Sequence, residues 1–180
     1  MLDYIILGMV LDEALCGYDI KKAIEKGVGV FYKASYGSVY PGLRRLTDRG
    51  DLVMREEPRG ERTRKLYGAT QAGRASFMSW LASPLNVLDG TSAHLAKVYF
   101  FDRLAPDRRD EQLRELEANN QAYLRELQTL ERDFAQHDTA GYYHRLSTLY
   151  YGIRVVQESI RWCQHIRAGK PLAELIETGD

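Results

Sequence analysis

Hydrophobic residues recur at the three- and four-residue spacing of an amphipathic helix throughout residues 1–50. The first series predicts a short helix and consists of Leu2, Ile5, Ile6, Met9 and Val10. The second follows the helix breaker Gly17 and consists of Ile20, Ala23 and Ile24. The third consists of Val39, Leu43 and Leu46. The spacing therefore predicts three short helices in succession, the second ended by Gly27 and Gly29 and the third by Gly50.

The start of the third predicted helix has two candidate caps. Ser35 and Ser38 both carry the hydroxyl that an N-cap residue uses to accept a backbone N–H. Proline is best tolerated in the first helical turn, where its missing N–H costs nothing. Because Pro41 follows Ser38 so closely, we favour Ser38 as the N-cap.

After the third helix the pattern changes from helical to β-compatible. Residues 52–54 and 66–67 are apolar, and the stretch from Pro58 to Gly60 between them favours a turn. We therefore expect a β-hairpin with a charged tip. Thr70 then provides the N-cap of a fourth helix. The apolar face of that helix consists of Phe77, Trp80 and Leu81.

Three short helices followed by a two-stranded hairpin form a winged helix-turn-helix, whose third helix enters the major groove of DNA. The residues expected to contact DNA from this helix are Tyr36, Ser38, Tyr40, Arg44 and Arg45. Those expected to contact phosphates or the minor groove from the wing are Arg59, Arg62, Arg64 and Lys65. The alternative is that these charges form an ordinary solvated face. Basic residues on both the helix and the wing favour the DNA-binding interpretation.

The charge of the chain is unevenly distributed. The 180 residues carry 25 Lys+Arg and 25 Asp+Glu, so the formal net charge is zero. However, residues 33–74 hold 10 basic and 5 acidic residues, whereas residues 81–180 hold 12 and 15. The predicted DNA-binding segment is therefore locally basic, and the neutral total does not count against a nucleic-acid partner.

The second half of the chain repeats apolar residues every seven positions. The repeat occupies residues 113–134 and 142–163, with a break at 137–141. Two long helices of this kind predict an antiparallel hairpin, which as a monomer would expose much apolar surface. We therefore expect a homodimer with C2 symmetry. The residues expected at the dimer contact are Leu113, Leu116, Asn120, Leu127, Ile153 and Ile160.

Asn120 interrupts an otherwise apolar stripe. A buried asparagine at such a position fixes the register of packed helices at some cost in stability. Alternatively, the seven-residue repeat drifts relative to the helical turn, and Asn120 faces solvent. The sequence leaves both interpretations open.

The composition changes between Ser83 and Ser92 in a way that is typical of a linker. We therefore expect a mainly α protein with a winged helix-turn-helix domain at 1–83, a linker at 84–92 and a helical dimerisation domain at 93–180. Two winged domains related by a two-fold axis would read a pseudo-palindromic operator in double-stranded DNA, with half-sites about one helical turn apart.

Other classes of function lack support in the sequence. The two cysteines, Cys16 and Cys163, lie far apart, which argues against a disulfide scaffold and fits a reducing compartment. The four histidines lack metal-ligand spacing, and no nucleotide-binding or hydrolase motif is present. No apolar run approaches the roughly 18 residues that cross a bilayer. We therefore expect a cytoplasmic protein that is not an enzyme and has no cofactor, metal or membrane partner.

Five short runs in the first half of the chain form a recognisable set of motifs. They are Gly17-Tyr18-Asp19-Ile20, the run GSVYPGLRRL at 37–46, Gly50-Asp51-Leu52-Val53, Arg64-Lys65-Leu66-Tyr67 and Thr70-Gln71-Ala72-Gly73. In these motifs, residues 1–82 resemble the PadR family of bacterial transcriptional regulators. Two positions depart from the family pattern: Gly42 replaces a branched or aromatic residue, and Ala69 replaces a frequent leucine. The resemblance implies a homodimeric repressor, often released from its operator by a small aromatic or hydrophobic ligand.

A small-molecule effector of this kind would require an aromatic-lined pocket. The candidates for lining it are Phe77, Trp80, Tyr99, Tyr123 and Tyr150. The alternative is that these aromatic residues fill an irregular interface. For the protein as a whole, the alternative function is a winged-helix module that binds other proteins and lacks sequence-specific DNA binding.

Overall fold

The structure is a computed structural model that describes residues 1–33, 35–59, 62–85, 91–135 and 142–177. It contains two compact units, and we describe each by itself. The first comprises Met1–Ser83 with Asp89–Ala105, and the second comprises Pro84–Leu88 with Pro106–Asp180. The fold is mainly α-helical with one small antiparallel sheet, as predicted.

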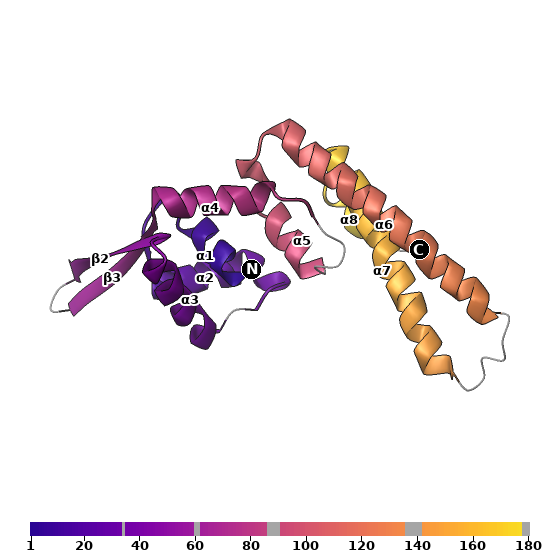
Figure 1. Cartoon of the computed structure of the whole chain (residues 1–180), viewed down its shortest axis with the longest axis horizontal. Helices are drawn as coiled ribbons and strands as arrows, with labels where there is room; N and C mark the ends of the chain where they lie inside the picture. Colours follow the sequence, from indigo (N-terminus) through magenta and orange to yellow (C-terminus); the bar gives the residue numbers. More distant parts are fainter. Residues whose placement is uncertain (34, 60–61, 86–90, 136–141, 178–180) are drawn as a thin grey trace. The chain divides into compact units, whose positions relative to one another are not determined.

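Three helices form the body of the first unit, in agreement with the three apolar series. They are α1 (Leu2–Met9), α2 (Gly17–Lys26) and α3 (Tyr36–Asp48), seen together in Figure 1. The predicted stripes meet in a core that includes the buried side chains of Ile5, Ile20, Ile24, Leu43 and Leu46. The hydrophobic effect of burying these stripes holds the three helices together.

The N-cap of α3 is Ser35, so the prediction that favoured Ser38 is wrong. The backbone N–H of Ser35 donates to Oγ of Ser38 at 3.0 Å, and that hydroxyl donates to the Ser35 carbonyl at 2.9 Å. Because these reciprocal bonds satisfy the helix start, Pro41 lies inside the helix, where it forgoes one backbone hydrogen bond. At the other end, Gly50 has a φ of 78° and ends the helix as predicted, since this left-handed conformation favours glycine.

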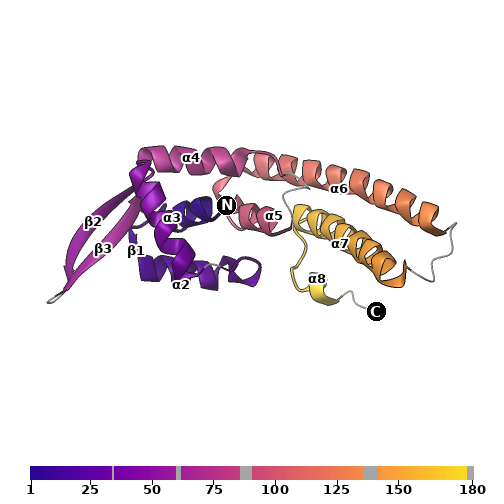
Figure 2. The same ribbon diagram turned by 60° about the horizontal axis from the view of Figure 1, so that its bottom comes forward.

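The wing is a hairpin of β2 (Leu52–Arg59) and β3 (Arg62–Ala69), visible in Figure 2. Leu52 lies opposite Ala69, and Arg59 lies opposite Arg62. A third strand, β1 (Leu15–Cys16), pairs with β3 on its other edge. The sequence did not predict β1, because two residues are too few to form a recognisable alternation.

The helix after the wing, α4 (Gln71–Ala82), begins as predicted at Thr70, whose hydroxyl accepts the backbone N–H of Gly73 at 3.0 Å. The next helix, α5 (Thr91–Val98), belongs to the first unit. Its buried Lys97 donates to the carbonyl oxygen of Ser83 at 2.8 Å and lies over the ring of Trp80.

The boundary between the units therefore differs from the predicted start of the helical domain at residue 93. Residues of α5 and of the 3-10 turn η3 (Phe101–Arg103) are buried in the first unit, among them Ala96 and Phe101. Of the predicted linker at 84–92, residues 86–90 lie outside the described residues.

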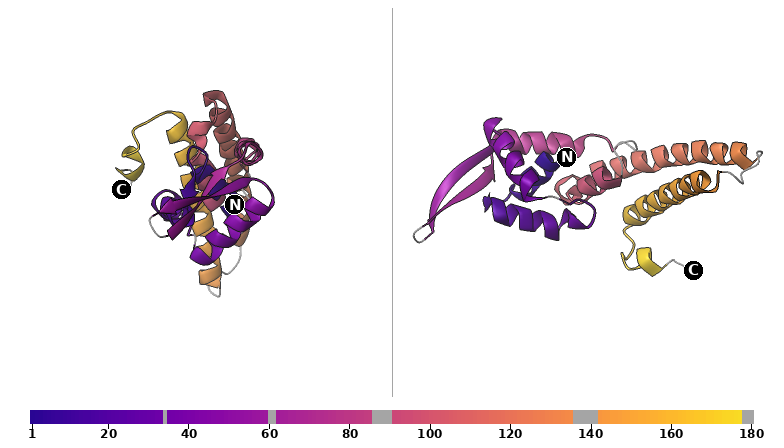
Figure 3. Two further views of the ribbon diagram at one scale, coloured as in Figure 1. Left: turned by 90° about the vertical axis from the view of Figure 1, so that its left-hand side faces the viewer. Right: turned by 90° about the horizontal axis from the view of Figure 1, so that it is seen from below.

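The second unit contains α6 (Pro106–Ala135), α7 (Tyr143–Arg167) and the short α8 (Glu174–Glu177). Side chains of Asp110 and Glu117 bond to Arg167, and Asn120 bonds to Ser159, so α6 and α7 run antiparallel, as Figure 3 shows. The predicted helical hairpin is confirmed. The predicted break at 137–141 lies outside the described residues.

Part of each apolar stripe of the hairpin is buried within a single chain. A core cluster joins Leu127 of α6 to Ile153 and Val156 of α7, with Leu124, Leu149 and Ile160 packed around it. Asn120 is 3% exposed, so the interpretation that it faces solvent is wrong. Within the described ranges, no helix combines the length and the apolar character needed to cross a membrane.

Candidate nucleic-acid interface

The outer face of α3 presents one arginine to solvent with little restraint. The side chain of Arg44 is 85% exposed, and its nearest carboxylate, that of Asp48, lies 3.8 Å away on the same helix. At that distance and exposure the pair contributes little to stability. The guanidinium of Arg44 therefore keeps its hydrogen-bond donors available for an anionic or base-edge partner.

Tyr40 lies one helical turn before Arg44 and is about half-exposed. Its ring packs on the first residue of α2, where a Cβ added to Gly17 would come within 2.8 Å of Tyr40 Cε1. Burial raises the pKa of Tyr67 in β3, and the neighbouring Tyr40 raises it further. Tyr40 thus lies where α2, α3 and the wing meet.

Two further residues, Ser38 and Tyr36, were predicted to contact DNA from the start of α3. Ser38 uses its hydroxyl in the helix cap with Ser35, which limits its capacity to bond another group. Tyr36 is the first residue of α3, but its side chain lies outside the described residues.

The guanidinium of Arg45 points toward α1, where it is ion-paired. Its Nη2 donates to Oδ1 of Asp3 at 2.7 Å. Arg49, one turn later, donates to Oδ2 of the same carboxylate at 3.3 Å and to Asp51 at 2.8 Å. The structure therefore separates the two adjacent arginines that the sequence grouped together: Arg44 is open, and Arg45 is ion-paired.

The wing also has both an ion-paired and an exposed basic residue. Arg64 turns toward α2 and pairs with the carboxylate of Asp19, which also accepts the thiol of Cys16 at 3.2 Å. The hydrogen bond with Cys16 raises the pKa of the Arg64 guanidinium, and the charge of Asp19 adds to this effect. These contacts fasten β3 to the start of α2.

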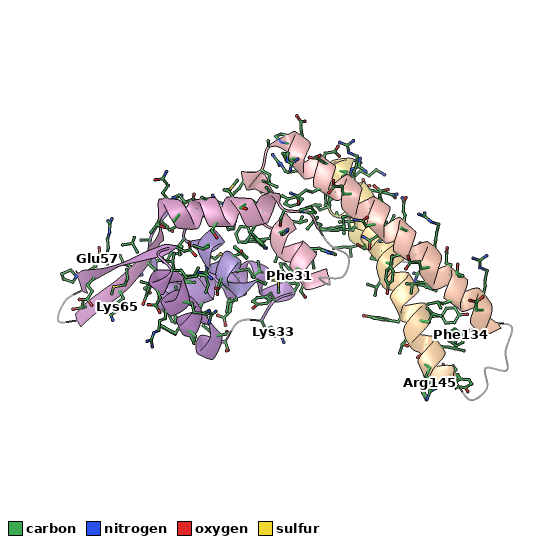
Figure 4. All side chains as sticks on the ribbon, viewed as in Figure 1. Phe31, Lys33, Glu57, Lys65, Phe134 and Arg145 are labelled. Carbon is green, nitrogen blue, oxygen red and sulfur yellow. The ribbon has the colours of Figure 1, made fainter. Side chains whose placement is uncertain are left out.

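Lys65, the next residue of β3, is exposed and lies on the wing near Glu57, as Figure 4 shows. Arg59 and Arg62 face each other in register near the end of the hairpin, and their side chains lie outside the described residues. The wing thus offers Lys65 to a partner while Arg64 holds the wing to the helical body.

The six residues predicted at the dimer contact are buried or packed within one chain. Leu113, Leu116, Asn120, Leu127 and Ile153 are buried, and Ile160 packs against the core cluster. The second unit exposes a different set of large apolar side chains. They include Leu130, Phe134, Tyr143, Tyr151 and Val155.

The five aromatic residues predicted to line an effector pocket are divided between the units. Phe77, Trp80 and Tyr99 belong to the first, and Tyr123 and Tyr150 belong to the second. Phe77 is fully buried, whereas a hydrogen bond with Glu131 raises the pKa of Tyr150 on the hairpin.

Tyr99 lines a pocket of about 470 Å³ in the first unit. The other lining residues are Gly8, Met9, Phe100, Asp102 and Arg103. The rings of Tyr99 and Phe100 meet edge to face with centroids 4.9 Å apart. Arg103 is held by Asp12 through two hydrogen bonds of 2.6 and 3.1 Å, and this bond lowers the pKa of Asp12.

Asp3, Asp19 and Arg49 are the residues of this region that sequence reasoning missed. Asp3 is 42 positions from Arg45 and Asp19 is 45 from Arg64, so no local pattern connects the partners. Arg49 carried a weak signal, because it lies four residues after Arg45 and therefore on the same side of the helix.

A winged helix-turn-helix joined to a helical hairpin is the architecture of a transcriptional regulator. The model of the transcriptional regulator PadR-like family matches residues 6–79, and that of the virulence activator alpha C-terminal region matches residues 92–169. The chain is 30% identical over 133 residues to the negative transcriptional regulator PadR of Bacillus subtilis, covering 71% of each protein. The chain therefore belongs to the PadR-like family of transcriptional regulators, and it is a regulator and not an enzyme.

Further relatives are more distant. A probable transcriptional regulator of Mycobacterium tuberculosis is 27% identical over 89 residues, which is 47% of this chain and 46% of that protein. The crystal structure of Bacillus subtilis PadR with operator DNA is 24% identical in sequence and has a TM-score of 0.47. The match covers 93% of this chain and 97% of the chain in that crystal structure. The same protein with p-coumaric acid gives a TM-score of 0.43 at 24% identity, covering 93% of each chain.

Proposed function

We propose that the protein is a homodimeric repressor that binds a pseudo-palindromic operator in double-stranded DNA with α3 and the wing. The observation that carries this proposal is the exposure of Arg44 on the outer face of α3, beside the half-exposed Tyr40. A helix with such a face fits the major groove, where arginine makes the commonest specific contact, to guanine.

Each exposed residue has a separate part in the proposed complex. Arg44 reads a base edge or a phosphate, and the phenol of Tyr40 contacts the sugar-phosphate backbone beside it. Lys65 on the wing binds flanking phosphate, together with Arg59 and Arg62. Lysine acts there as a point charge, so the wing adds affinity without adding sequence preference.

Dimerisation is supported by the exposed apolar side chains of the hairpin. Tyr143 and Tyr151 of α7 are 74% and 73% exposed. Leu130 and Phe134 of α6, the latter labelled in Figure 4, are about half-exposed. Several large apolar side chains exposed on one helical hairpin favour an interaction site, and two-fold pairing of identical chains is the commonest arrangement.

Repression and release by an effector are proposed from the Bacillus subtilis relative. That protein is a negative regulator and has been crystallised with operator DNA and with p-coumaric acid. We propose a small aromatic effector for this chain and place it in the pocket beside Tyr99 and Phe100. Aromatic walls favour an aromatic ligand through stacking and edge-to-face contacts.

Fluorescence anisotropy tests the DNA-binding proposal. The purified protein is titrated with the DNA upstream of its own gene and with a shuffled duplex of equal length, at several salt concentrations. We expect a preference for the upstream DNA and an affinity that falls steeply with salt, since each protomer displaces several counterions. Equal binding of both duplexes would contradict sequence-specific recognition. A stable monomer without DNA affinity would favour the protein-interaction alternative.

Isothermal titration with p-coumaric acid tests the effector proposal. We expect the wild type to bind it and Tyr99→Ala to lose binding, while Tyr123→Ala, which alters an aromatic residue of the second unit, retains it. Loss of binding in Tyr123→Ala with retention in Tyr99→Ala would contradict the proposed pocket.

A further inference from the structure

One carboxylate on α1 holds two arginines, one on α3 and one at the C-cap of that helix. The Oδ1 atom of Asp3 accepts Nη2 of Arg45 at 2.7 Å, and its Oδ2 atom accepts Nη1 of Arg49 at 3.3 Å. The Asp3 side chain is 18% exposed, whereas the two arginine side chains are 55% and 52% exposed. Each oxygen of this carboxylate therefore has its own guanidinium.

Gly42 provides the space in which this cluster forms. A Cβ added to Gly42 would lie 2.8 Å from the Cδ1 atom of Ile6, 3.6 Å from Asp3 Oδ1 and 3.7 Å from Arg45 Nη2. The missing side chain therefore lets α1 approach α3 closely enough for Asp3 to reach its partners. Glycine is an unfavourable residue inside a helix, and this close approach accounts for it here.

The cluster continues beyond α3 through Arg49. Its Nε and Nη2 atoms donate to Oδ2 of Asp51 at 3.0 and 2.8 Å. The carbonyl of Asp51 accepts the backbone N–H of Thr70 at 3.0 Å, at the start of α4. Arg49 is thus held between two carboxylates, and Arg45 is held by one.

Arg44 differs from Arg45 and Arg49 in its ion pairing. Arg44 and Arg45 lie on the helix that we assign to the major groove, and Arg49 is its C-cap. Arg44 has only the carboxylate of Asp48, 3.8 Å away. An exposed arginine without a close carboxylate partner binds the phosphates of any DNA, and such contacts supply sequence-independent affinity.

Specificity is the ratio of the affinities for operator and for other DNA. On other DNA no base contact fixes the position of the protein, so an unpaired arginine beside Arg44 settles on the nearest phosphate, whereas on the operator the contact of Arg44 fixes where its neighbours lie. Unpaired neighbours therefore strengthen binding to other DNA more than binding to the operator.

We propose that Asp3 is a specificity-determining residue of the regulator. Its carboxylate neutralises Arg45 and Arg49 within the folded chain, so that they do not bind phosphate. Base recognition is then left to Arg44, with Tyr40 contacting the backbone beside it. This role rests on the proposed DNA-binding function, because it concerns the balance between operator and other DNA.

The variant Asp3→Asn tests this role, because asparagine preserves the shape of the side chain and removes its charge. Affinities for the operator and for a shuffled duplex are measured from low to high salt. We expect affinity for the shuffled duplex to rise by about tenfold at low salt, and the slope of log K against log salt to steepen by about one to two per protomer, as one or two phosphates are newly neutralised. The ratio of operator to shuffled affinity should fall correspondingly.

Glu13→Gln is the matched control. Glu13 belongs to the same unit, is exposed and forms none of the ion pairs seen among the described residues, so its replacement changes the net charge equally. We expect this variant to keep the wild-type ratio of affinities. A proportional change for both duplexes in Asp3→Asn, matching that in Glu13→Gln, would overturn the proposal.

A second variant keeps the test decisive if Asp3→Asn fails to fold. In the double variant Arg45→Gln and Arg49→Gln, the lost charges weaken binding to both duplexes. The proposal requires the wild-type salt slope and the wild-type ratio of operator to shuffled affinity, because these arginines bind no phosphate in the wild type. A shallower slope would overturn it. Failure of the proposed function is distinguishable, since the wild type itself would then show no preference for the operator.

Discussion

The side-chain amide of Asn120 on α6 donates to the hydroxyl of Ser159 on α7 at 3.2 Å, inside the hairpin of one chain. The same nitrogen donates to the carbonyl of Leu116 at 2.9 Å. A polar group in this position is satisfied only when the two helices pair in one register. The asparagine therefore specifies the hairpin as well as stabilising it.

The first prediction concerns this bond. Asn120→Asp replaces a donor with a carboxylate that is nearly inaccessible to solvent and faces a carbonyl oxygen, so it should lower the free energy of unfolding by about 2–4 kcal/mol at neutral pH. Urea unfolding followed by circular dichroism measures the change. Asn119→Asp, at the adjacent exposed position, should alter stability by no more than about 0.5 kcal/mol. Equal effects of the two substitutions would show that the buried amide has no special role.

The second prediction concerns the outer face of α3. Arg44→Ala removes the open guanidinium and should weaken operator binding by about 1–3 kcal/mol per half-site, while the protein remains folded and keeps its oligomeric state. The control is Arg125→Ala, an exposed arginine of α6, which changes the charge equally. Anisotropy titrations compare the two variants. Wild-type affinity in Arg44→Ala would show that α3 is not the recognition helix.

The third prediction concerns the exposed apolar face of the hairpin. Tyr151→Asp places a charge where we expect a partner chain, and it should raise the dimer dissociation constant by at least about tenfold. Gln157→Asp adds the same charge on another face of α7 and should leave that constant nearly unchanged. Sedimentation equilibrium measures both. A monomeric wild type, or an undisturbed dimer in Tyr151→Asp, would exclude this face as the dimer contact.

The fourth prediction concerns the two thiols. Burial raises the pKa of Cys163 from 9.0 to about 12, with a further contribution from the charge of Glu117. The folded thiol therefore keeps its proton over a range in which the unfolded thiol loses it. Its contribution to stability is complete below about pH 9 and is lost as the pH rises toward 12.

Ellman's reagent provides the measurement. At pH 8 the partly exposed Cys16 should react first, and Cys163 should react only after denaturant is added. In Cys16→Ser the fast phase should disappear. Rapid reaction of both thiols in the native protein would contradict the burial of Cys163.

The order and type of the elements followed from local pattern. Apolar spacing predicted α1, α2 and α3. The two β-compatible apolar runs on either side of a turn predicted the wing, and Thr70 marked the start of α4. The misplaced cap of α3 had a local cause too, because the preference of Pro41 for a first turn was outweighed by the reciprocal hydrogen bonds of Ser35 and Ser38. The two-residue strand β1 had no pattern at all.

The candidate site was predictable only as a set of residue types. Sequence spacing placed Arg44 and Arg45 outside the apolar stripe of α3, and nothing in that spacing distinguished one from the other. Their difference depends on Asp3, which is far away in sequence and reaches Arg45 because Gly42 lets two helices approach. The same holds for Arg64, which is paired with Asp19 of α2, and Lys65, which is exposed.

The sequence by itself determined the winged helix-turn-helix, the helical hairpin and the basic character of the segment that carries α3 and the wing. These features depend on periodicity and composition, which are local properties of the chain. Only the tertiary structure decided which cations remain open, which part of each heptad stripe packs against the other within one chain, and that α5 belongs to the first unit. Ion pairing and burial depend on contacts between residues far apart in sequence, and those contacts exist only once the chain has folded.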